Sequence, residues 1–114
     1  MIVQVWHVRA EHFRAALRGE PVAFSPDNYQ QVAVLEPWGE RSACVEAAYG
    51  EAFQATYSFD ADWTQQRVSG EWIVTPLLLR CRSTSVGDVV VVDGRAMRCA
   101  GIGWTPLAET EEGR

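Results

Sequence analysis

The sequence contains no lysine, so each of its ten basic side chains is an arginine. Fifteen acidic residues outnumber them, and the formal net charge is −5 with a pI near 4.9. Binding to nucleic acid draws much of its affinity from cations that meet phosphates. This charge balance therefore argues against a general nucleic-acid surface.

Long hydrophobic runs are also missing, and we expect no secretory signal. No apolar run approaches the roughly 20 residues that a membrane-spanning helix needs, and residues 1–9 lack the basic start and apolar core of a secretory signal. The cysteines, Cys44, Cys81 and Cys99, are odd in number and widely spaced, which disfavours a disulfide framework. We therefore expect a soluble, cytoplasmic protein in a reducing compartment, with no membrane partner.

The strongest local signal lies between Arg82 and Trp104. Four valines at 89–92 are followed by Asp93 and Gly94, and a second β-rich run comes next. Both central residues of a type I′ turn need positive φ, which Asp-Gly supplies at low cost. The stretch therefore predicts a β-hairpin near the C-terminus.

Further strands are predicted where apolar and polar residues alternate. Such alternation covers residues 2–8 and 29–35, with Pro37 ending the second run. Residues 71–80 are also rich in apolar side chains, but Pro76 stands in their middle. Because proline cannot donate to a sheet ladder, this segment predicts two short extended pieces or an edge strand.

Two segments have apolar residues at helical spacing. Residues 11–18 form the shorter one, and residues 42–56 form the clearer one, with Ser42 placed to serve as its N-cap. Gly50 lies inside the second helix, where glycine costs roughly 1 kcal/mol relative to alanine. We therefore expect a close packing contact at Gly50.

These elements predict a single α+β domain over residues 1–108, followed by an acidic, disordered tail over residues 109–114. The domain is expected to hold an antiparallel sheet of four or five strands, two helices on one face of that sheet, and the C-terminal hairpin. The expected core consists of Val3, Val5, Phe13, Leu17, Val32, Val34, Val45, Tyr49, Phe53, Ile73, Val90, Val92 and Cys99.

The segment over residues 82–90 reads RSTSVGDVV, and the blocks after it are Asp93-Gly94-Arg95, Gly103-Trp104 and Pro106-Leu107. This ending resembles that of YodL-like domains, which are small domains in proteins of phages, plasmids and conjugative elements. Residues 48–53, followed by Asp60 and the Asp62-Trp63 pair, are similar to the helix and loop that often precede that ending in small actinobacterial and phage proteins. The resemblance implies a protein of a mobile genetic element, and it transfers no catalytic residue.

A candidate binding site precedes the hairpin. Arginines followed by successive hydroxyls and backbone N–H groups fit an anion, which could be a phosphate, a nucleic-acid backbone or a partner's carboxylate. The serines could instead end a strand and satisfy turn amides, with Asp88 accepting hydrogen bonds from them. The candidate anion- or partner-binding residues are Arg80, Arg82, Ser83, Thr84 and Ser85.

Two tryptophans fall in predicted loops. Trp38 and Trp63 are candidate interface aromatics, because tryptophan supplies much of the binding energy at protein interfaces; the alternative for each is a packed lid. Asp60 and Asp62 next to Trp63 have the oxygen ligands of a cation site, but nothing nearby completes one, so capping or turn roles are the expectation.

No metal site, cofactor or catalytic residue is predicted. His7, His12 and the cysteines lack the close spacing of a zinc knuckle. A cysteine and histidine pair needs the base within hydrogen-bond reach of the thiol, and the sequence does not place one there.

Three functions remain open. The leading hypothesis is a non-enzymatic protein-interaction module of a mobile genetic element. The second is an acidic DNA mimic that blocks a host defence or restriction system, which predicts carboxylates aligned on one face. The third is a phosphate-ligand binding protein or enzyme centred on Arg80, Arg82 and residues 83–85, which predicts a concave pocket there.

Overall fold

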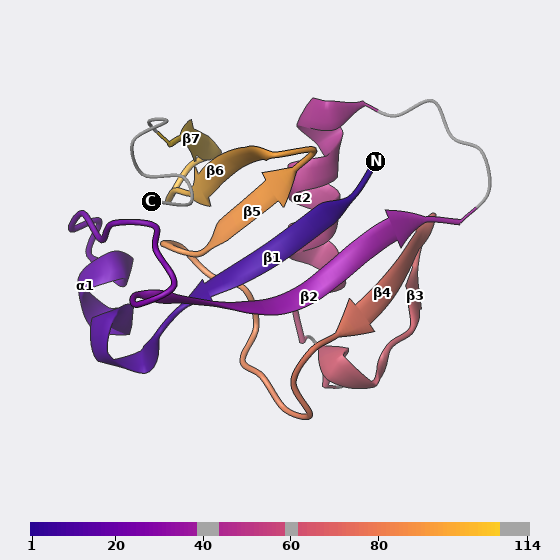
Figure 1. Ribbon diagram of the computed structural model, residues 1–114, viewed down its shortest axis with the longest axis horizontal. Coiled ribbons are helices and arrows are strands. Elements are labelled where there is room, and N and C mark those ends of the chain that lie inside the picture. Colours follow the sequence, from indigo (N-terminus) through magenta and orange to yellow (C-terminus); the bar gives the residue numbers. More distant parts are fainter. Residues whose placement is uncertain (39–43, 59–61, 108–114) are drawn as a thin grey trace.

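The computed structural model describes residues 1–38, 44–58 and 62–107 (Figure 1). Its strands are β1 (Val3–Val8), β2 (Tyr29–Pro37), β3 (Val68–Ser69), β4 (Trp72–Pro76), β5 (Val89–Val92), β6 (Arg95–Cys99) and β7 (Trp104–Pro106). Its α-helices are α1 (Phe13–Leu17) and α2 (Val45–Ala55), and 3-10 turns cover Ala10–His12 and Trp63–Gln65. The predicted α+β class is confirmed.

The sheet has seven strands among the described residues, in the order β3-β4-β2-β1-β5-β6-β7, and every neighbouring pair is antiparallel. The expectation of four or five strands is therefore an undercount. The strands that sequence reasoning missed are β3, with two residues, and β7, with three. Strands this short have no alternation to detect.

Pro76 ends β4 and does not divide it. β4 pairs with β2 on one side and with β3 on the other, so the prediction of two pieces or an edge strand is wrong. The chain bends over residues 77–80 directly after the proline. A proline at the last position of a strand interrupts no hydrogen bond inside the ladder.

The two helices pack against opposite faces of the sheet, which corrects the expectation that they share one face. Buried residues of α2 form one cluster with Val5 and Val90. Ala16 of α1 belongs to a second cluster with Val89 and Val91. Because successive residues of a strand point to opposite faces, Val90 and its two neighbours lie on different sides of the sheet.

A β-bulge in β2 sets which of its residues face the core. Val5 pairs with Ala33 but Trp6 pairs with Gln31, so Val32 is the extra residue. Val32 is buried on the α2 side together with Ala33 and Leu35, whereas Val34 is only partly buried. The predicted alternation with Val32 and Val34 on one core face fails because the bulge shifts the period by one residue.

The C-terminal hairpin is confirmed. Val92 pairs with Arg95, and the turn residues Asp93 and Gly94 have φ values of 48° and 82°. Two predicted core residues are exposed instead: Leu17, in a helix of only five residues, and Ile73, on the face of β4 away from α2.

Several expectations fall outside the described residues. These are the N-cap role of Ser42, the position of Asp60 and the tail over residues 109–114. Cys44 occupies the N-cap position of α2 and makes no side-chain capping hydrogen bond. No helix in the described ranges is long and apolar enough to cross a membrane.

Gly50→Ala is expected to raise the free energy of unfolding by about 0.5–1 kcal/mol. Gly50 is exposed within α2, and a Cβ built there meets no atom of another described segment within 4 Å, so the close packing contact expected for it is absent among the described residues. Urea denaturation measures the change. Gly94→Ala is the matched control: φ is +82° there, so the same substitution is expected to destabilise the protein. A destabilising effect of Gly50→Ala would contradict this description of α2.

Candidate functional site

The loop before β5 is built around Asp88, whose side chain is fully buried. Its Oδ1 accepts a hydrogen bond from the Val8 N–H at 2.9 Å, and its Oδ2 accepts one from the Ser85 N–H at 2.8 Å. Both terminal nitrogens of Arg82 also donate to this carboxylate, at 2.6 and 2.7 Å. A buried charge is tolerated only when it is paired and hydrogen-bonded in this way.

Arg82 is therefore engaged inside the protein. Its guanidinium also donates to the carbonyls of Ser83 and Val8 and lies over the Phe13 ring, 4.3 Å from the ring centroid. Asp88 neutralises its charge, and the carboxylate accepts hydrogen bonds from both terminal nitrogens of the planar guanidinium. A phosphate at this position would have to compete with Asp88. Arg80, two residues earlier, is exposed.

The hydroxyl residues of the predicted anion site also have internal partners. Ser83 Oγ accepts a hydrogen bond from the Ser58 N–H at 2.8 Å. Thr84 is buried, and Ser85 donates its N–H to Asp88. This geometry corresponds to the alternative in which the hydroxyl run satisfies loop amides and Asp88 accepts from the folded-back loop.

The two loop tryptophans differ in exposure. Trp63 is fully buried, and its Nε1–H donates to the Arg82 carbonyl at 2.9 Å. An interface role for Trp63 is therefore excluded by burial: its ring is part of the core. Trp38 is 55% exposed, with its Nε1–H donating to the Gly70 carbonyl, and it remains available for contact.

Asp62 acts as a cap. Its Oδ1 accepts hydrogen bonds from the N–H and the hydroxyl of Thr64, at 2.9 and 2.7 Å. These two hydrogen bonds hold the pKa of the Asp62 carboxyl below its usual value. This is the capping role expected for an aspartate at the start of a helical turn.

A buried polar chain starts at His7, which lies in the first strand predicted from the sequence. His7 lies on the face of β1 that packs towards α2, and its Nε2 is 2.8 Å from Thr84 Oγ1. Thr84 Oγ1 is 2.6 Å from Thr56 Oγ1, and the Thr56 hydroxyl donates to the Ala52 carbonyl at 2.8 Å. The chain joins β1, the C-terminal end of α2 and the loop before β5.

The direction of donation along this chain follows from its last member. A carbonyl oxygen can only accept a hydrogen bond, so the Thr56 hydroxyl donates its one hydrogen to the Ala52 carbonyl. Thr84 must then donate to Thr56, and the Thr84 oxygen accepts from His7. His7 therefore carries its hydrogen on Nε2, and its Nδ1 presents a bare lone pair.

That lone pair faces a thiol. Cys81 Sγ lies 3.2 Å from His7 Nδ1, and all three cysteines are free. The two residues border an open cleft of about 270 Å³, whose other lining residues include Arg9, Glu11, Gln30 and Leu78. They are 74 positions apart in the chain. The only feature of the sequence that points to His7 is its spacing. It follows Val3 and Val5 at intervals of two residues, which places the three side chains on the same face of β1.

Burial keeps this pair neutral. It lowers the pKa of His7 to about 4, with the Asp88 carboxylate opposing the shift and the Arg82 guanidinium adding to it. It also raises the pKa of the Cys81 thiol, although Arg82 opposes that change. Both shifts disfavour the charged form, as expected for groups removed from water.

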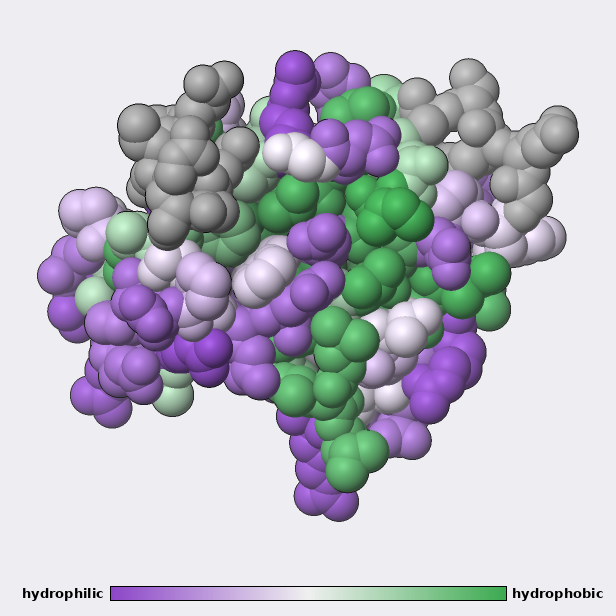
Figure 2. All heavy atoms as spheres, viewed as in Figure 1, coloured by the Kyte–Doolittle hydropathy of each residue, from purple (hydrophilic) through white to green (hydrophobic). Residues whose placement is uncertain are grey.

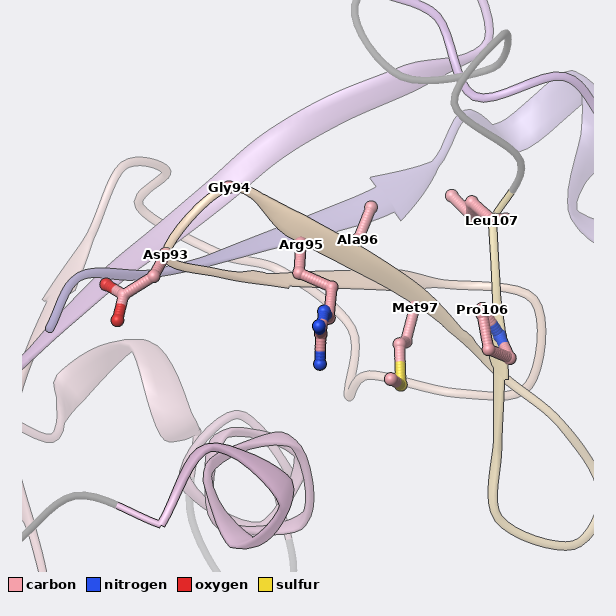
Figure 3. A pocket seen from close by; sticks show the side chains of 7 residues that line it. All are labelled: Asp93, Gly94, Arg95, Ala96, Met97, Pro106 and Leu107. Carbon is pink, nitrogen blue, oxygen red and sulfur yellow. The ribbon is translucent and has the colours of Figure 1, made fainter.

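A second cleft, about 510 Å³, runs along β6 (Figure 3). Arg95 and Met97 point to one side of the strand and Ala96 to the other. Asp93 at its end accepts a hydrogen bond from the Ile2 N–H at 3.0 Å. The residues lining this cleft include no thiol, imidazole or hydroxyl side chain, so its chemistry is less suited to catalysis than that of the Cys81 cleft.

Exposed apolar side chains gather at the bend after β4. Leu79 is 90% exposed and Leu77 is 47% exposed. On the sheet, Val68 of β3 lies directly opposite Ile73 of β4, and both are exposed. Figure 2 shows hydrophobic side chains in a band that reaches the lower edge of the molecule, where Figure 1 places the bend after β4.

Comparisons of the chain with protein-family models, with curated proteins and with solved structures found no match. Within the parts of the chain that the structure describes, no group of three or more His, Cys, Asp or Glu side chains is placed to hold a metal ion.

Proposed function

We propose that the protein is a non-enzymatic interaction module that binds a protein partner through the bend after β4, and that it serves a mobile genetic element. The observation that carries the proposal is the exposure of Leu79, 90%, next to Leu77 in the same bend. Burial of apolar surface is favourable by about 25 cal/mol per Å². A partner with an apolar pocket would recover this energy on binding.

The surroundings of the bend support the same role. Val68 of β3 and Ile73 of β4 form a second pair of exposed apolar side chains, on the strands that precede the bend. A single exposed leucine is ordinary on a protein surface, whereas several grouped apolar side chains are typical of contact sites. The mobile-element part of the proposal is supported by the resemblance of residues 82–90 to YodL-like domains.

The internal pairing of Arg82 favours this function over phosphate binding. The Arg82 guanidinium is held by the Asp88 carboxylate, and Thr84 is buried. The hydroxyl run thereby shapes the loop that carries the bend. We expect the contact to be made by the leucines and not by the hydroxyl groups.

Leu79→Asp is expected to reduce partner capture at least tenfold, because the substitution places a charge where an apolar pocket must close, and a tenfold change is about 1.4 kcal/mol of binding free energy. Tagged protein is incubated with host lysate, and captured proteins are quantified by mass spectrometry for wild type and variant. The candidate partner is then purified and titrated directly.

Ile102→Asp is the matched control. Ile102 is 97% exposed in the loop between β6 and β7, so this variant changes the charge of the protein equally without touching the bend. It is expected to capture the partner as the wild type does. Equal capture by Leu79→Asp and wild type, or equal loss in both variants, would contradict binding through the bend.

A further inference from the structure

We infer that Cys81 is a nucleophile that accepts an acyl group from an activated ester or thioester, with His7 as its general base. This goes beyond the proposed partner binding and does not depend on it: the protein itself keeps the acyl group after a single transfer, so the non-enzymatic role proposed above is unchanged. The inference rests on the 3.2 Å separation of Cys81 Sγ and His7 Nδ1 at the border of an open cleft. A nucleophile within hydrogen-bond reach of a base is the arrangement that acyl transfer needs.

The base is oriented by a third group. Donation from His7 Nε2 to Thr84, and from Thr84 to Thr56, leaves the bare Nδ1 facing the thiol. In the neutral imidazole one ring nitrogen donates and the other accepts, so the tautomer decides whether the ring can take a proton from sulfur. Thr84 and Thr56 are thus positioning residues for His7.

The reaction balances without a further reactant. The Cys81 sulfur attacks the acyl carbon as the thiol proton passes to His7 Nδ1, and the new S–C bond replaces the bond from the acyl carbon to the leaving oxygen or sulfur. The imidazolium then returns the proton to the leaving group. The product is an acyl thioester on Cys81 together with a free alcohol or thiol.

The electrostatics of the pair define how this thiol differs from an ordinary one. An exposed thiol reacts through its thiolate, and its rate rises roughly tenfold per pH unit below its pKa. Cys81 loses its proton to His7 only as the bond forms, and an imidazole whose pKa lies near 4 is already a free base above pH 5. The rate at Cys81 is therefore nearly independent of pH between 5.5 and 7.5.

The test is a time course of acetylation by 4-nitrophenyl acetate, with the modified cysteine identified by peptide mass spectrometry at several pH values. Cys44 is exposed in the same chain and serves as the internal control. We expect acetyl-Cys81 to form at a nearly constant rate over this range, while the rate at Cys44 rises with pH, as it does for a thiol that reacts through its thiolate. Acetylation of Cys44 without Cys81, or parallel pH profiles at the two sites, would overturn the inference.

Variants separate the roles of the residues. His7→Gln is expected to abolish the pH-independent reaction at Cys81. Thr84→Val removes the hydroxyl that fixes the tautomer of His7 and is expected to lower the pH-independent rate at Cys81, here called the plateau. Thr84→Ser keeps the hydroxyl and is expected to retain the wild-type rate. A plateau that persists in His7→Gln, or that is equal in the valine and serine variants, would contradict the roles of His7 and Thr84.

Discussion

Asp88→Asn is expected to lower the free energy of unfolding by about 3–5 kcal/mol, which is a large share of the stability of a domain of this size. The substitution keeps the shape of the side chain but removes its charge. It leaves the Arg82 guanidinium, which the carboxylate binds at 2.6 and 2.7 Å, without a counterion. It also turns one acceptor into a donor in a cluster whose other members donate. Urea denaturation monitored by tryptophan fluorescence measures the loss.

Asp93→Asn is the control with the same chemical change. Asp93 sits in the hairpin turn at φ 48°, a conformation that asparagine adopts readily, and asparagine before glycine favours the same type I′ turn. We expect the free energy of unfolding to change by no more than about 0.5 kcal/mol. Equal effects of the two substitutions would show that Asp88 does not organise the loop.

A double-mutant cycle identifies the source of the Asp88 effect. Adding Arg82→Met to Asp88→Asn removes the unpaired cation, so the double variant is expected to be less destabilised than the sum of the two single variants. Additive effects would mean that the backbone amides of Val8 and Ser85, and not Arg82, account for the loss.

Acid is expected to destabilise the protein through His7. The free energy of unfolding is expected to fall by about 2 kcal/mol between pH 8 and pH 5. The unfolded chain binds a proton at this imidazole near pH 6.5, but the folded protein does so only near pH 4. The unfolded state therefore binds more protons between these values. The His7 contribution is complete above pH 6.5 and is lost as the pH falls towards 4.

Chemical denaturation at half-unit steps from pH 8 to pH 5 measures the slope of the free energy of unfolding against pH. Most carboxylates remain ionised in this range. His7→Gln is expected to flatten the curve whatever its own stability, because the titrating group is gone. His12→Gln replaces the other histidine by the same residue and is the matched control, in which the pH dependence assigned to His7 is expected to remain. A slope that survives His7→Gln would assign the acid sensitivity to another group.

Local signals predicted much of the fold. The alternation in β1, the helical spacing in α2 and the Asp-Gly turn of the hairpin are each encoded within a dozen residues, and each is present in the structure. The bulge at Val32 and the placement of the helices on opposite faces depend on pairing between distant segments. Sequence periodicity does not report such pairing.

The candidate site divides in the same way. The sequence predicts, as the alternative to an anion site, that Asp88 accepts hydrogen bonds from its own loop. Such a contact is local, because Ser85 and Asp88 are three residues apart. The contact between His7 and Cys81 spans 74 positions and arises only when β1 and the loop before β5 come together. Exposure at Leu79 could not be predicted either, since three successive leucines are equally consistent with a buried segment.

The tautomer of His7 tests the buried network most directly. A long-range proton–nitrogen correlation spectrum at pH 7 distinguishes the two ring nitrogens, and His12→Gln assigns the signals to His7. We predict a neutral ring with its hydrogen on Nε2 and a bare Nδ1, as the chain from His7 through Thr84 and Thr56 to the Ala52 carbonyl requires. A ring protonated on Nδ1, or an imidazolium at pH 7, would contradict both the direction of this chain and the role of His7 as a base for Cys81.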